Sequence, residues 1–223
     1  MSGLARRALT RPYAAVAVAL VAFLASLLLM LVLPLETFRR WTSEEGFFEQ
    51  ASWIGYLAAG ALCLLMARRD PRLYLPCSVV LLAMCARELD WHRRFTTDSF
   101  LKSRYFLKVQ APLAEKLIAG AVVLALTALV LYLVVRYWRP FLRALRARVP
   151  AAVTLATTVA LLVVTKTADR LPGILRDDYG LRLPDALARL DMVLEEPMEL
   201  AIPLLILLAI AQARAGASAA RAT

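Results

Sequence analysis

The feature that most constrains this chain is an uninterrupted apolar run near its beginning. Residues 13–35 hold no charged side chain over 23 positions. As a helix, such a run is long enough to cross a hydrocarbon core of about 30 Å. It is longer than the apolar core of a secretory signal, and no clear small-x-small cleavage site follows it. We therefore predict that it is retained as a membrane span.

Five further apolar runs follow along the chain. Together with the first they predict six transmembrane helices, at residues 13–35, 50–67, 73–90, 115–135, 150–168 and 194–213. A hydrophobic content of 61% in 223 residues is too high for a soluble domain. The predicted fold is all-α: a polytopic membrane protein, a bundle of six transmembrane helices that forms a single transmembrane domain over residues 1–223.

The distribution of charge predicts how the chain sits in the membrane. Six spans place both termini on the same side of the membrane. The segments on that side carry 13 basic residues and one acid, Asp70, whereas the segments on the other side carry 14 basic residues and 16 acids. The basic residues alone are nearly balanced, but they lie in shorter connections on the first side, which predicts an N-in/C-in orientation. The chain has a net charge of +10, and its basic residues flank the predicted spans. We therefore expect membrane lipids and no nucleic acid as partners.

Several ionisable side chains are predicted to lie at one depth, near the outer ends of their helices. Each of these residues is about 22–30 Å, measured along the helix axis, from the nearest basic residue at the cytoplasmic end of its own predicted span. The acids and the only histidine form three i,i+4 pairs, which share a helix face wherever the chain is helical. These pairs are Glu45 with Glu49, Glu88 with His92, and Glu195 with Glu199.

Carboxylates beside one imidazole suit a hard or borderline divalent cation. We therefore predict metal ligands among Glu45, Glu49, Glu88, His92, Glu195 and Glu199, with Glu88, Asp90 and His92 as candidate catalytic residues. One histidine excludes a three-histidine zinc site and bis-histidine haem, and the chain has no glycine-rich nucleotide loop. Cys63, Cys77 and Cys85 lie within predicted spans without metal-ligand spacing, and no disulfide is implied.

Two other interpretations of the same charges remain open. The acids are also explained by ion pairs inside the protein, for which Arg87, Lys166, Asp169 and Arg170 are the candidate residues. Charged side chains are also ordinary at helix ends, where the hydrocarbon stops.

The outer loop 93–116 interleaves basic and aromatic residues. This pattern suits contact with an anionic lipid headgroup or a lipid-linked phosphate, and the candidate residues are Arg93, Arg94, Lys102 and Arg104. Residues 170–190 are predicted to form an outer interfacial segment. Residues 136–148 are predicted to form a basic amphipathic helix on the cytoplasmic leaflet.

Three acidic motifs carry a family resemblance. EEGFFEQASW precedes the second predicted span, RELDWHRRFTTDSFLKSRYF follows the third, and LEEPMELAIPLL opens the last. In these motifs the chain resembles a group of small bacterial inner-membrane proteins that have acidic motifs at the same three places and no assigned activity. The resemblance implies a multi-pass protein of the bacterial inner membrane, and it supplies no substrate.

From the residues we expect a periplasm-facing acidic site that binds a divalent cation for work on a lipid or lipid-linked substrate. One alternative is a small proton- or cation-coupled transporter, which at 223 residues without a visible inverted repeat would be expected to act as an oligomer. The other alternative is a non-catalytic membrane assembly or stability factor with a structural salt-bridge layer. A homo-oligomer or another membrane protein is the expected protein partner.

Overall fold

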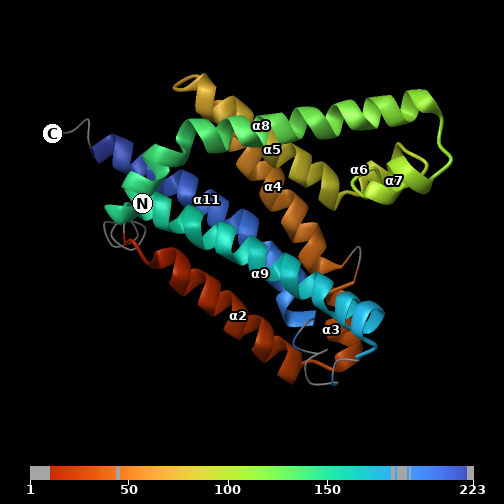
Figure 1. Cartoon of the computed structure of the whole chain (residues 1–223). Helices are drawn as coiled ribbons and strands as arrows, with labels where there is room; N and C mark the ends of the chain where they lie inside the picture. The colour runs from red at the N-terminus through yellow and green to blue at the C-terminus, as the bar shows by residue number, and fades with distance from the viewer. Residues whose placement is uncertain (1–10, 44–45, 182–183, 185–189, 191, 220–223) are drawn as a thin grey trace. The chain divides into compact units, whose positions relative to one another are not determined.

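The computed structural model describes residues 11–43, 46–181, 184, 190 and 192–219. Within these ranges the chain is helical and contains no strand (Figure 1), which confirms the all-α class. The chain divides into two compact units. The first unit comprises residues 1–55 and 142–223, and the second comprises residues 56–141.

The first unit is built around α11 (Glu196–Ala219), which packs against α9 (Pro150–Tyr179) and α2 (Ala14–Val32). These three helices lie side by side in Figure 1, and α2 also contacts α9. The side chains of Met198, Ile202 and Leu205 are buried here. Because α11 meets two partners, its apolar side chains form much of this unit's core, and any charge on its inner face must find a partner inside the protein.

Short connections and a close contact complete the first unit. Pro34 follows α2 and begins α3 (Leu35–Trp41), as expected for a residue that cannot continue a helix. At the beginning of α4 (Phe47–Met66), Gly55 lies so close to α11 that a Cβ atom added to it would be 2.9 Å from Cβ of Pro203. This approach requires a glycine.

The second unit holds the rest of α4, α5 (Pro71–Glu88), α6 (Trp91–Arg94), α7 (Ser103–Lys108) and α8 (Leu113–Arg146) up to Phe141. The Asp70 side chain caps α5 by accepting from the Leu73 N–H at 3.3 Å, and Pro71 follows it. The buried Ser78 hydroxyl donates to the Gly60 carbonyl at 2.8 Å, which ties α5 to α4.

Three of the six predicted spans coincide with helices that have the length and composition to cross a membrane. These are Ala14–Val32 of α2, Leu113–Arg146 of α8 and Pro150–Arg176 of α9. The predicted spans 50–67, 73–90 and 194–213 form α4, α5 and α11, but these helices are not in that set. α4 carries one charged residue, Glu49, α5 and α11 carry several, and α5 has only 18 residues. A count of six membrane-crossing helices is therefore not confirmed.

Two predicted interfacial segments continue the helix that precedes them. Residues 136–146 are the end of α8 and residues 170–179 are the end of α9, with Pro140 and Pro172 inside the helices. The α9 helix ends where Gly180 adopts φ +66°, a left-handed conformation that suits glycine. The predicted loop 93–116 contains α7, the end of α6 and the beginning of α8, and most of the predicted 170–190 segment beyond Leu181 lies outside the described residues.

Candidate functional site

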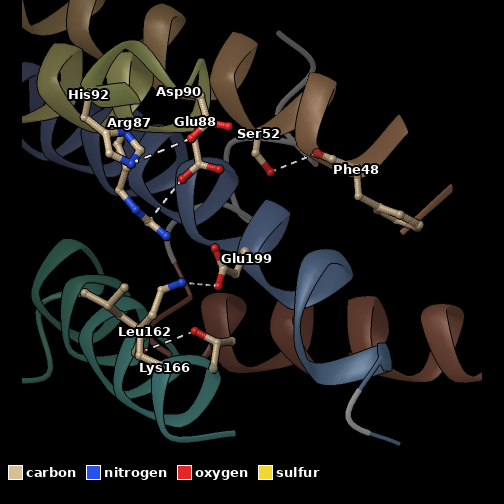
Figure 2. A network of polar contacts seen from close by, with 10 residues as sticks. Phe48, Ser52, Arg87, Glu88, Asp90, His92, Leu162, Lys166 and Glu199 are labelled. Atoms are coloured by element: carbon tan, nitrogen blue, oxygen red, sulfur yellow. Dashed lines mark hydrogen bonds and ion pairs between the residues drawn. The ribbon is translucent and has the colours of Figure 1, made fainter. Parts of the chain in front are cut away.

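An ion pair joins two helices of the first unit. Lys166 Nζ of α9 donates to Glu199 Oε1 of α11 (Figure 2), and the side chains are 31% and 10% exposed. Lys166 lies 16 residues after Pro150, about 24 Å along a helix with the length to cross a membrane. A charge at such a position is costly unless it is paired, so the contact neutralises both side chains where water is scarce.

A second polar contact joins the same two helices further along. The Thr154 hydroxyl and the Gln212 side-chain oxygen are 2.6 Å apart, and both residues are buried. From Thr154 to Lys166 is 12 residues on α9, and from Glu199 to Gln212 is 13 residues on α11, about 18–20 Å in each case. The two contacts therefore hold α9 and α11 antiparallel in a fixed register.

The second unit has its own charged corner where α5 meets α6. Arg87 Nη1 lies 3.2 Å from Glu88 Oε1, and the Glu88 side chain is only 9% exposed. Asp90 adopts φ +53° and lies 3.7 Å from His92 Nε2 (Figure 2). Asp90 also lies 3.7 Å from Arg93 Nη1. Burial lowers the pKa of His92, although the Asp90 carboxylate opposes that shift.

The predicted i,i+4 faces depend on continuous helix, and the structure interrupts the helix between Glu88 and His92. The α5 helix ends at Glu88 and a separate four-residue helix holds His92, because Asp90 takes a left-handed conformation between them. Glu195 lies in a turn before α11, although its carbonyl accepts from the Glu199 N–H at 3.0 Å. Glu45 lies outside the described residues, and Glu49 is half-buried in the first turn of α4.

No group of three histidine, cysteine, aspartate or glutamate side chains that could hold a metal ion occurs among the described residues. Glu49, Glu195 and Glu199 belong to the first unit, whereas Glu88, Asp90 and His92 belong to the second. Each unit alone therefore holds only some of the six metal ligands that the sequence predicted. The divalent cation stays a prediction.

The candidate ion-pair residues fall into two classes. Lys166 forms an ion pair with Glu199, and Arg87 forms one with Glu88. Asp169 and Arg170 are exposed on α9, and neither makes an ion pair with any residue that the structure describes. Of these four candidates, Lys166 and Arg87 thus pair with nearly buried carboxylates, whereas Asp169 and Arg170 lie at the surface of α9.

The segment that holds the residues predicted to meet lipid headgroups also contains a cluster that the sequence did not indicate. Glu115, in the first turn of α8, accepts hydrogen bonds from the Thr97 N–H at 2.6 Å, the Thr97 hydroxyl at 2.9 Å and the Tyr105 hydroxyl at 2.7 Å. Burial, together with the bond to Glu115, raises the pKa of Tyr105 to about 12. Arg93, Arg94, Lys102 and Arg104 are exposed in the same segment.

Sequence reasoning missed both Glu115 and the Thr154–Gln212 contact. A glutamate such as Glu115 is ordinary at a helix end, and its partners Thr97 and Tyr105 are 18 and 10 residues away in the sequence. The threonines of α9 left a weak signal: Thr154, Thr158 and Thr165 recur on one helix face and all are buried. A polar stripe in an apolar helix indicates a face that meets another helix.

Comparison with known proteins found no match among family models, curated proteins or solved structures.

Proposed function

We propose that this chain is a multi-pass helical protein of the bacterial cytoplasmic membrane whose buried charges hold its helices together. In this proposal it acts as a non-catalytic assembly or stability factor. The observation that carries the proposal is the ion pair between Lys166 of α9 and Glu199 of α11. The bacterial setting rests on the resemblance of the three acidic motifs, and the membrane setting is supported by three helices of sufficient length and apolar composition.

The partners of the buried carboxylates favour this structural role over a cation site. Glu199 and Glu88 have nearly buried side chains, and each meets a basic side chain of its own unit. The Lys166 ammonium group occupies the position next to Glu199 Oε1 that a metal cation would take. A metal ion would therefore have to displace Lys166 and leave an unpaired ammonium inside the helix pair.

A double-mutant cycle on the purified protein in detergent tests the structural role. Lys166→Met removes the charge but keeps an unbranched side chain, so the nearly buried Glu199 carboxylate loses the Lys166 ammonium group beside it. We expect a loss of about 1–3 kcal/mol, less than for a fully buried pair because Lys166 is partly exposed. The double variant Lys166→Met/Glu199→Leu replaces both charges and is expected to regain most of the loss.

The matched control uses the exposed charges of the same helix. Asp169→Asn and Arg170→Gln change α9 by one charge each and are expected to shift the unfolding free energy by less than about 0.5 kcal/mol. Metal content by mass spectrometry, measured on the same samples, tests the alternative. A near-stoichiometric metal that Glu199→Gln and Glu88→Gln both lose, with Lys166→Met as stable as wild type, would replace the structural proposal with a cation site.

A further inference from the structure

The segment from Trp91 to Lys116 has a fold of its own within the second unit. Glu115 receives three hydrogen bonds from Thr97 and Tyr105, and the Tyr105 side chain is fully buried. Arg104 pairs with Asp98 at 3.0 Å, and Lys116 Nζ donates to the Phe106 carbonyl at 3.3 Å. These contacts fix α7 against the beginning of α8.

The position of α7 relative to α8 sets its depth in a membrane. Glu115 is the third residue of α8, and Phe106 lies 3.8 Å from the position of a Cβ added at Gly120, the eighth. The first two turns of α8 are therefore beside α7, and α8 is one of the helices with the length to cross a bilayer. At the end of a membrane-crossing helix, α7 lies at the level of lipid headgroups.

The outward face of α7 combines an apolar side chain with basic ones. Arg104, Leu107 and Lys108 are spaced i, i+3 and i+4, so they share a helix face and are exposed, whereas Tyr105 is buried. Leu107 is 80% exposed, and the neighbouring Leu101 and Lys102 are exposed as well. An exposed leucine among cations is suited to insertion between headgroups.

The charge of the segment selects the kind of headgroup. Residues 91–116 hold six basic residues and two acids, Asp98 and Glu115, and both acids are engaged in contacts within the segment. We propose that this face of α7 docks on anionic phospholipid headgroups of the bilayer that holds the chain. The inference is independent of the structural role of Lys166 and Glu199, which lie in the other unit.

A nitroxide label placed on the full-length protein by Leu107→Cys tests the proposal. The labelled protein is compared in nanodiscs of phosphatidylcholine alone and in nanodiscs that contain phosphatidylglycerol, and spin-label collision with oxygen and with a water-soluble relaxant reports its depth. We expect a deeper label in the anionic nanodiscs. Lys102→Gln/Lys108→Gln should abolish this difference, because each basic residue near an anionic surface contributes about 1 kcal/mol, roughly fivefold in affinity.

The matched control is Arg139→Gln/Arg143→Gln, which removes two charges far along α8 from this face and should leave the lipid dependence intact. A label that faces water in both nanodiscs would overturn the proposal. A label equally immersed in both, and unchanged by the lysine variant, would also overturn it, because the face would then be covered without recognition of headgroup charge.

Discussion

His92 carries a buried nitrogen that the surrounding side chains leave without a hydrogen bond. Its Nδ1 has no hydrogen-bond partner among the residues the structure describes, and its other ring nitrogen faces Asp90 at 3.7 Å. The ring also lies edge-on to Phe100 with centroids 6.3 Å apart. The charged groups around it are Asp90, Arg93, Arg87 and Lys102, and three of these four are cations. Burial is the main reason that a second proton on this imidazole is unfavourable in the folded protein, and the three cations add to it against the effect of Asp90.

The lowered pKa of His92 predicts a loss of stability in mild acid. A base whose pKa is lower in the folded than in the unfolded state contributes fully above its unfolded pKa, about 6.5, and the contribution is lost as the pH falls through the folded pKa. We expect the melting temperature of the wild type to fall by a few degrees more than that of His92→Gln between pH 7.5 and 5.5. Parallel pH profiles for the two proteins would contradict this prediction.

Single residues also explain which parts of the candidate site the sequence could predict. The burial of Glu88 and Glu199 follows from their position at the ends of apolar runs, which composition and helical rise reveal. The left-handed conformation of Asp90 separates Glu88 from His92, and no spacing rule signals it because aspartate is also compatible with a continuing helix. The bonds from Tyr105 and Thr97 to Glu115 depend on tertiary folding.

Among the helices, the contact of α4 with α11 leaves no space for a side chain at Gly55. A methyl group there would lie 2.9 Å from Pro203 Cβ and 3.1 Å from Pro203 Cγ, and the rigid proline ring cannot rotate away. We expect Gly55→Ala to lower the free energy of unfolding by about 1–3 kcal/mol, as overpacking of a close contact does. Thermal unfolding of the purified protein in detergent measures this.

Gly173 provides the control, because it is also helical but has no atom within 4 Å of an added Cβ. Gly173→Ala is expected to be neutral or to stabilise the protein by up to about 1 kcal/mol, since alanine restricts the unfolded chain more than glycine does. Equal effects of the two substitutions would show that the contact between α4 and α11 does not limit the size of residue 55.

Helix positions follow from the apolar runs, whereas helix lengths do not. Long runs without charge predict α2, α8 and α9 because only a helix satisfies the backbone of such a run inside a membrane. The ends of α8 and α9 extend through basic and acidic residues that the sequence assigned to separate interfacial segments. Pro140 and Pro172 lie inside them without ending the helix, so proline alone was a poor guide to the boundaries.

At the level of the whole molecule, the number of membrane crossings decides which segments share a side. If all six predicted helices cross, the connection near Arg69 and the segment from Trp91 to Lys116 lie on opposite sides of the membrane. If only α2, α8 and α9 cross, the whole stretch between α2 and α8 lies on one side. The two arrangements therefore differ at a pair of exposed positions, Arg69 and Lys102.

We predict that α4 and α5 cross the membrane together, as a pair tied by Ser78 and Gly60, so that Arg69 is cytoplasmic and Lys102 is external. The apolar stretches of both helices and the basic residues around Arg69 favour this arrangement. Arg69→Cys and Lys102→Cys, each made in a chain without Cys63, Cys77 and Cys85, are treated with a membrane-impermeant maleimide in spheroplasts. Labelling of Lys102→Cys alone is expected, with both labelled after permeabilisation. If both or neither react before permeabilisation, the two positions share a side, and α4 and α5 then pack on the membrane-crossing helices without spanning the bilayer.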